Sequence, residues 1–155
     1  MNPNSASETV TSAVVVRDAI IEDYTAIAHL LGELDYPSMP DGVRQRLARL
    51  LPRDDTRVFV AERAAKVLGV LGLHRIAVLT SLSDVAMIIA LVVTESARRS
   101  GVGRLLVARA EDEARAWGCG RIMVTSADRR DDAHEFYRRL GYDSTGRRFA
   151  KTIGP

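Results

Sequence analysis

The stretch ARRSGVGRLL, residues 97–106, interrupts an apolar region with three arginines and two glycines. It follows VAMIIALVV, residues 85–93, which is apolar on both faces and therefore typical of a central strand that is covered on both sides. The residues after it, GVGRLLVARAEDEARAWG, have the spacing of a long amphipathic helix that ends at Gly118 and Gly120. The sequence thus predicts a strand, a glycine–arginine turn and a helix in succession.

Such a turn is typical of an anion-binding site. The first backbone N–H groups of a helix have no partner within the helix and carry a partial positive charge, and glycines let a ligand approach them closely. Phosphate groups are the usual ligands of such a site, and three arginines flank it here, Arg98, Arg99 and Arg104. We therefore predict a phosphate-binding turn.

Two common phosphate motifs do not match this turn. A nucleotide P-loop requires Lys and then Ser or Thr after its last glycine, whereas Gly103 is followed by Arg104 and Leu105. A dinucleotide-binding turn requires a small residue where Leu106 stands. The pattern that does match is Arg-x-x-Gly-x-Gly, from Arg98 to Gly103.

The rest of the chain predicts alternating strands and helices around this unit. Residues 66–76 contain Gly69 and Gly72, which indicate a bulge or a close backbone approach, and Ala64-Ala65 is a tight link between two strands. Strands are predicted at 14–17, 56–63, 66–76, 85–93 and 121–127, with a strand–turn–strand over 142–153. Helices are predicted at 18–34, 41–51, 101–118 and 128–142, the last capped by Asp128 and ended by Gly141.

Length and composition set the broad class of the protein. The 155 residues predict one domain over residues 14–155, preceded by a disordered polar tail over residues 1–13. A single cysteine, Cys119, excludes an internal disulfide, and the chain shows neither a secretory signal nor an apolar run long enough to cross a membrane. We expect a cytoplasmic protein with no membrane association.

The charge pattern argues against two further classes. A net charge of only +2, without interleaved aromatic and basic residues, gives little support to a nucleic-acid-binding domain, although the arginine clusters keep it as a distant alternative. The three histidines, His29, His74 and His134, do not form a metal-binding spacing with Cys119. We expect neither a nucleic-acid partner nor a metal.

Three segments together resemble the GCN5-related N-acetyltransferase (GNAT) family. They are the turn Arg98 to Gly103, the strand end LVV at residues 91–93, and AHEFYRRLGY at residues 133–142. The similarity extends over residues 14–153 and is specific only from 91 to 142. It implies an α/β (α+β) fold with a mixed, mostly antiparallel sheet of six to seven strands, about four helices, and a splayed parallel pair at 85–93 and 121–127.

The resemblance also implies a donor and its binding residues. Acetyl-CoA would lie in the V between the splayed strands. Its pantetheine arm would follow the strand end Leu91, Val92 and Val93, pairing with Leu91 and Val93. Tyr137 matches the family tyrosine that gives a proton to the departing thiolate, and amphipathic packing beside Phe136 is the alternative explanation. The backbone of the turn would hold the pyrophosphate, through Arg98, Arg99, Ser100, Gly101, Val102, Gly103 and Arg104. Asp128 lies where the family often contacts the cofactor, although a helix cap also explains it.

One expected residue is missing. Many family members carry a glutamate in the fourth strand as general base, but residues 85–93 contain no acid. Asp84, Glu62, His74 or a water chain are the candidates, and the sequence does not choose among them. The missing acid also leaves open a non-catalytic module that binds or senses acyl-CoA.

The function expected from these residues is direct acetyl transfer, in a ternary complex, to a primary amine of a small molecule or peptide. An acetyl-cysteine intermediate is not expected, because Cys119 is at the far end of the long helix in the sequence. Arg44, Arg46, Arg49 and Arg53 indicate either an anionic acceptor or a solvated helix face. A homodimer is the default expectation for the family.

Overall fold

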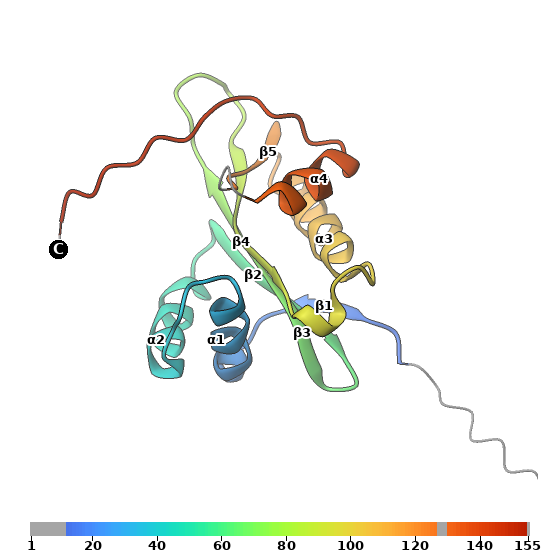
Figure 1. The fold of residues 1–155 in the computed structure, drawn as a ribbon. Coiled ribbons are helices and arrows are strands. Elements are labelled where there is room, and N and C mark those ends of the chain that lie inside the picture. Colours follow the sequence, from blue (N-terminus) through green and yellow to red (C-terminus); the bar gives the residue numbers. More distant parts are fainter. Residues whose placement is uncertain (1–11, 127–129, 155) are drawn as a thin grey trace, which may run out of the picture.

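The computed structural model describes residues 12–126 and 130–154, and Figure 1 shows their fold. Five strands form one mixed sheet in the order β1-β2-β3-β4-β5, so each strand lies beside its neighbour in the sequence. The strands are β1 (Val15–Asp18), β2 (Thr56–Arg63), β3 (Lys66–Ile76), β4 (Val85–Val93) and β5 (Arg121–Val124). The α-helices are α1 (Tyr24–Glu33), α2 (Pro40–Leu50), α3 (Val102–Ala116) and α4 (Asp131–Arg139), with short 3-10 helices at Ile21–Asp23 and Glu95–Ala97.

The helices cover the sheet on both faces. Figure 1 shows α1 and α2 on one side and α3 and α4 on the other. On the α3 side the apolar core is built around Phe59, Leu71 and Leu106, which have no exposed surface. On the α1–α2 side Leu30, Val60 and Val92 are packed in a second core. The sheet is therefore a two-sided support, and β4 contributes to both cores as its sequence predicts.

The predicted hairpin between β2 and β3 is confirmed. Ala64 and Ala65 both adopt positive φ, 49° and 60°, which matches the twist that a two-residue link requires. The predicted close approach at Gly69 is also present, because a Cβ there would lie 2.9 Å from the Val92 carbonyl oxygen and 3.0 Å from Leu106. These two features bring β3 against β4 and α3.

A bulge and a divergence shape the middle of the sheet. Gly72 pairs with Ala90 and Leu73 pairs with Ile88, so Ile89 is the extra residue of a bulge in β4. On its other side β4 pairs in parallel with β5, but only from Val85 to Ile88. The remainder of β4 has no strand partner on that side among the described residues. The predicted parallel pair is therefore confirmed from Val85 to Ile88, and its splay stays a prediction.

Three expectations about element boundaries are wrong. The sheet has five strands in the described residues, not six or seven, because the predicted strand–turn–strand at 142–153 is absent. Residues 143–154 form an exposed extended segment, in which Phe149 and Ile153 are more than nine-tenths exposed. This segment has too few apolar residues, between Arg147, Arg148 and Lys151, to cover a sheet edge. Helix α4 begins at Asp131 with Arg130 as the residue before it, so its cap position is not Asp128.

Two other expectations fall on residues that are not described. Asp128 itself lies outside the described residues, as does most of the predicted disordered tail at 1–13.

The start of α1 is held to the sheet by a charged cluster. Asp23, which is 7% exposed, accepts hydrogen bonds from Arg17 Nη1 at 2.8 Å and Nη2 at 2.9 Å and from the Ile20 N–H at 2.8 Å. Glu62 on β2 completes the cluster at 2.6 Å from Arg17. Burial alone would raise the pKa of Asp23, but these hydrogen bonds outweigh it and hold the pKa below its usual value. The cluster fixes the entry of α1 from β1.

Asp23→Asn should therefore lower the free energy of unfolding by about 2 kcal/mol at pH 7, since it removes a buried charge-assisted pair. A carboxylate with a depressed folded pKa stabilises the fold above its unfolded pKa, about 4, and that contribution is lost as the pH falls through the folded pKa. Urea denaturation at pH 7 and below pH 4 checks this. The difference between wild type and variant should shrink at the lower pH, and a constant difference would contradict the ionic explanation.

Candidate active site

The turn before α3 has the geometry of an anion cradle. Gly101 precedes the helix with φ of 87°, and Arg99 has φ of 61°. Counting from the start of α3, the first backbone N–H group with a hydrogen-bond acceptor is that of Leu105, which donates to the Gly101 carbonyl at 3.1 Å. The N–H groups of Val102, Gly103 and Arg104 have no acceptor among the described residues. These three donors, at the positive end of a 15-residue helix, fit a diphosphate.

Side chains around the turn have different roles. Arg98 folds back, and its Nε donates to the Val93 carbonyl at 3.1 Å, with Nη2 3.6 Å from Glu33. The Ser100 hydroxyl closes the turn by donating to the Ala97 carbonyl. Arg99 and Arg104 are exposed and form no ion pair within the described part of the chain. These two arginines are thus the free positive charges of the cradle.

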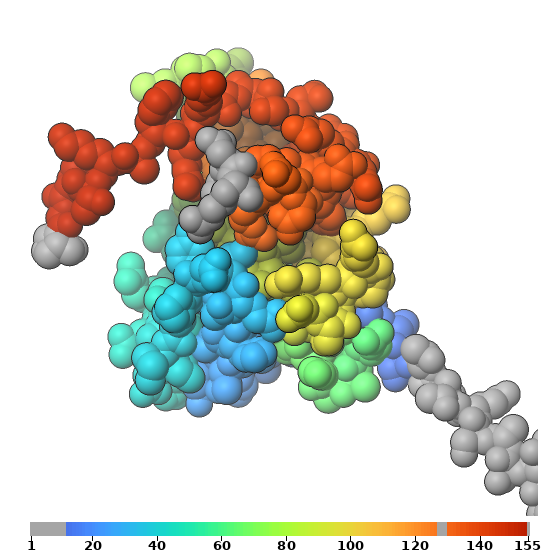
Figure 2. Space-filling model, viewed as in Figure 1, coloured from blue at the N-terminus to red at the C-terminus, as the bar shows by residue number. Residues whose placement is uncertain are grey.

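Glu33 ties helix α1 to this turn. Its carboxylate accepts from the Thr94 hydroxyl at 2.8 Å and from the Glu95 N–H at 2.8 Å. Burial would raise the pKa of Glu33, but these hydrogen bonds outweigh that effect and lower it. In Figure 2 the yellow segment that contains the turn lies directly against the blue segment that contains α1. No local sequence pattern indicates this contact, because 61 residues separate Glu33 from Thr94.

The free edge of β4 presents backbone groups beside the turn. The Thr94 N–H donates to the Leu68 carbonyl on β3 at 2.8 Å. Because successive residues of a strand point their backbone groups in opposite directions, Val93 and Leu91 turn theirs away from β3, toward the space that β5 has left. Val92 turns its groups toward β3 and buries its side chain on the α1–α2 side. The backbone groups of Leu91 and the N–H of Val93 therefore face this space, while the Val93 carbonyl is occupied by Arg98.

Helix α4 covers the start of α3. A Cβ on Gly103 would lie 3.2 Å from the Phe136 ring and 3.7 Å from Val93, so a larger residue there would require the Phe136 ring to shift. The next residue, Tyr137, packs its ring against Phe136 and Tyr142, with centroids 5.2 and 5.6 Å away. Its hydroxyl has no hydrogen-bond partner among the described residues. Burial raises the pKa of Tyr137 to about 12, against a smaller opposing effect of Arg130. The hydroxyl therefore remains a proton donor at neutral pH.

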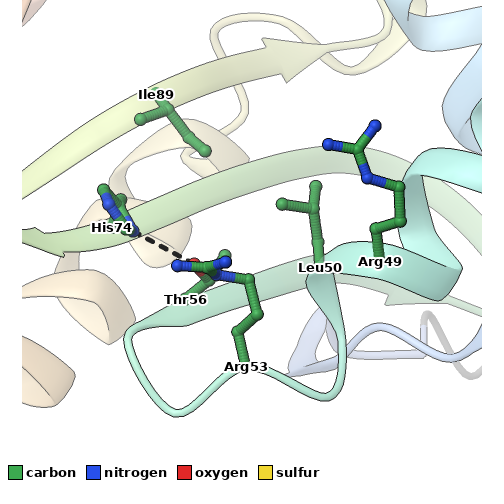
Figure 3. Close-up of a pocket in the computed structure, with 6 residues that line it drawn as sticks. All are labelled: Arg49, Leu50, Arg53, Thr56, His74 and Ile89. Carbon is green, nitrogen blue, oxygen red and sulfur yellow. Dashed lines mark hydrogen bonds between the residues drawn. The ribbon is translucent and has the colours of Figure 1, made fainter.

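A cavity of about 280 Å³ opens on the α1–α2 side of the sheet, below the bulge of β4. Figure 3 shows how its residues come together from α2, the loop after it, and the three central strands. Its polar side chains carry mainly positive charge. Six residues line it: Arg49, Leu50, Arg53, Thr56, His74 and Ile89. Ile89, the bulged residue of β4, thus lines this cavity. The edge of β4 that faces β5 lies on the other side of the same strand.

The two arginines of the cavity differ in how they are paired. Arg53 forms a two-pronged pair with Asp55, at 2.8 Å from Nε and 2.6 Å from Nη2. The hydrogen bonds from Arg53 are the main cause that lowers the pKa of Asp55 to about 2. Arg49 has no ion-pair partner among the described residues. Arg49 is therefore the cation available to an anionic ligand.

The structure separates the three candidate bases. Glu62 is held by Arg17 at the β1 side of the sheet. Asp84 lies 3.8 Å from Arg75 and borders a different cavity, of about 310 Å³, beside Gly120. His74 alone of the three lines the cavity below the bulge.

Three features of the described ranges concern metal binding, membrane crossing and the reactivity of Cys119. No group of three His, Cys, Asp or Glu residues in them could hold a metal ion. None of the helices that the structure describes is long and apolar enough to cross a membrane. Burial is the main cause that raises the pKa of the Cys119 thiol, which makes it a poor nucleophile.

Comparison with known proteins agrees with this geometry. The sequence profile of the acetyltransferase (GNAT) family matches residues 18–142. An aminoalkylphosphonate N-acetyltransferase of Salmonella typhimurium is 35% identical over 151 residues, which cover 94% of this chain and 96% of that protein.

Solved structures show the same fold at lower identity. A GNAT family acetyltransferase of Staphylococcus aureus has a TM-score of 0.78 at 22% identity, covering 91% of this chain and 99% of its own. The aminoglycoside N-acetyltransferase AAC(6')-Iy, in complex with CoA, has a TM-score of 0.82 at 18% identity, covering 92% and 95%. The chain therefore belongs to the GNAT family and is an N-acetyltransferase that uses acetyl-CoA as its donor.

Proposed function

We propose that this enzyme acetylates the primary amine of a small acceptor that carries a phosphonate or a similar anionic group. The observation that carries the proposal is the unpaired Arg49 in a cavity beside the bulge of β4. A guanidinium binds the oxygens of a phosphonate in a two-pronged manner. The relative from Salmonella typhimurium, named for aminoalkylphosphonates, supports the same acceptor class.

In this proposal the donor binds on the other side of β4. The diphosphate of acetyl-CoA accepts hydrogen bonds from the N–H groups of Val102, Gly103 and Arg104, within the charge of Arg99 and Arg104. The pantetheine arm pairs with the backbone of Leu91, while the Val93 carbonyl is already engaged by Arg98. This places the thioester in the splayed space, close to the Tyr137 side of α4.

Transfer is direct in this arrangement. The acceptor amine passes the bulge at Ile89 and attacks the thioester carbonyl carbon, so the new C–N bond forms as the C–S bond breaks. The Tyr137 hydroxyl gives its proton to the leaving thiolate, and takes back the proton that the nitrogen loses on becoming an amide. No covalent enzyme intermediate is needed, in agreement with the raised pKa of Cys119.

A panel of amines with thiol release as the readout tests the proposal. The most informative pair is 2-aminoethylphosphonate and n-propylamine, which place the amine on chains of equal length with and without the anion. We expect the phosphonate to have the higher kcat/KM by more than about tenfold, the value of a charge-assisted contact. Binding of acetyl-CoA without turnover of any amine would contradict the proposal, and equal rates for the pair would contradict the acceptor class.

Arg49→Gln should raise KM for 2-aminoethylphosphonate about tenfold and change kcat little, because it removes binding that is equal in the ground and transition states. The rate with n-propylamine should stay as in the wild type. Arg46→Gln is the matched control, since Arg46 lies on the same helix, is exposed, and does not line the cavity. An equal loss for both acceptors would show that Arg49 does not contact the anion.

A further inference from the structure

We propose that His74 is the general base of this enzyme and that its Nε2 removes a proton from the acceptor ammonium in the cavity below β4. The inference rests on the proposed function, because it places the acceptor amine in that cavity. In this proposal His74 takes the place of the acidic residue that β4 lacks, since none of the nine residues of β4 is an acid.

The hydrogen bonds of His74 fix which ring nitrogen can accept a proton. Nδ1 lies 3.0 Å from the Asp55 carbonyl oxygen, an atom that can only accept, so Nδ1 must carry the hydrogen. The Thr56 oxygen is 3.1 Å from the same nitrogen, and the Thr56 hydroxyl gives its own proton to Asp55 Oδ1 at 3.0 Å. Nε2 therefore has a free lone pair, with no partner among the described residues.

The strand register directs His74 toward the acceptor side. His74 and Gly72 are two residues apart on β3, so their side chains lie on the same face of the sheet. Ile89 at the bulge leans over that face, because a Cβ on Gly72 would be only 2.9 Å from Ile89 Cγ1. Figure 3 shows His74 and Ile89 on neighbouring strands bordering one cavity. A base at this position reaches the cavity without a carboxylate on β4.

Charges from each neighbouring element act on His74. Asp55, in the loop after α2, has its carboxylate Oδ1 3.9 Å from Nδ1. Arg53 from the same loop pairs with that carboxylate, and Arg49 from α2 brings a positive charge to the cavity. Thr56 from β2 and Ile89 from β4 are uncharged. The nearest charge to the ring is thus a carboxylate behind Nδ1, opposite the nitrogen that faces the acceptor.

The proton balance of the reaction closes with this base. The acceptor arrives as an ammonium and transfers one proton to His74 Nε2, which leaves a neutral amine with a free lone pair. The amine attacks the thioester carbonyl, and its second proton ends on the coenzyme thiol by way of Tyr137. The products are a neutral amide and a neutral thiol, and the imidazolium releases its proton to solvent before the next turnover.

His74→Asn is the sharpest test, because its amide can still donate to the Asp55 carbonyl while Nε2 is lost. We expect kcat/KM for 2-aminoethylphosphonate to fall about 30-fold at pH 7, less than is common for a general base because water reaches this open cavity. The difference from the wild type should narrow as the pH approaches the pKa of the acceptor amine, where free amine is abundant. An acceptor amine of lower pKa should likewise reduce the difference in kcat/KM between His74→Asn and the wild type.

Asp84→Asn is the matched control, since Asp84 faces a different cavity and should leave the pH profile as in the wild type. Retention of the acetyl-CoA-induced rise in Tm shows that the His74→Asn protein is folded, and His74→Gln is the second variant should it unfold.

A kcat/KM profile for His74→Asn that follows the wild type from pH 5.5 to 9 would overturn the inference. If 2-aminoethylphosphonate is not a substrate of the wild type, the acceptor class is wrong, and the same profiles on whichever amine is acetylated still decide the role of His74. If the wild type acetylates no amine, the proposed function fails, and the role of His74 with it.

Discussion

Replacing Tyr137 by phenylalanine is expected to lower kcat about 100-fold or more, the contribution of a well-placed acid. The ring packing against Phe136 and Tyr142 is kept, and only the unpartnered hydroxyl is lost. The Tm rise with acetyl-CoA should therefore stay as in the wild type. Because the pKa of Tyr137 is raised to about 12, the wild-type kcat should show no alkaline decline from this residue up to pH 10.

Tyr142→Phe provides the comparison. The Tyr142 hydroxyl donates to Glu111 Oε1 at 3.1 Å and is thereby occupied within the protein. Its loss should cost about 1 kcal/mol of stability and leave kcat close to that of the wild type. Equal kcat values for the wild type and Tyr137→Phe, measured where chemistry limits the rate, would remove Tyr137 from the mechanism.

Reversing both free charges of the cradle, with Arg99→Glu and Arg104→Glu together, is expected to weaken acetyl-CoA binding more than 100-fold. Each reversal turns an attraction to the diphosphate into a repulsion, worth about 1–2 kcal/mol per site near a surface, so the pair reaches about 3 kcal/mol. A carboxylate at position 104, in the first turn of α3, interacts favourably with the helix dipole. Arg104→Glu should therefore not destabilise the ligand-free protein. Calorimetric titration with acetyl-CoA measures the change.

Arg115→Glu makes the same change of charge at the other end of α3. It removes contacts to Glu111 and Asp112 and should lower the Tm of the ligand-free protein, but the affinity for acetyl-CoA should remain. Gly103 is a less suitable position for a reversed charge, because any side chain there meets Phe136. Unchanged affinity in the double variant would place the diphosphate elsewhere.

Local sequence signals predicted the parts of the fold that local interactions determine. The bounds of β2, β3 and β4 match the apolar runs, and the glycine–arginine turn precedes a helix that begins at Val102. The link at Ala64 and Ala65 followed from the spacing of two strands alone. In each case the residues that form the feature are adjacent in the chain.

Most features that depend on distant residues were not predicted in detail. Gly72 indicated a bulge or a close approach, but the extra residue, Ile89 on β4, follows only from the register of β3 against β4, and the cavity joins residues 49 to 89 from five segments. The sequence does not choose among the candidate bases, and the proposal for His74 depends on its place in the cavity, away from Glu62 and Asp84. From the sequence, the arginines of α2 fit a solvated helix face or an anionic acceptor, and the cavity beside Arg49 is the observation that supports the proposed acceptor. The predicted strands at 142–153 failed because alternation there was weak and charges were dense.

A crystal structure of the wild-type chain with coenzyme A and 2-aminoethylphosphonate tests the central claim most directly. We predict diphosphate oxygens within hydrogen-bond distance of the N–H groups that open α3, the thiol in the space where β4 and β5 part, and the amine near His74 Nε2. The phosphonate should lie against Arg49. A diphosphate bound away from α3, or a phosphonate outside the cavity below the bulge, would contradict the account.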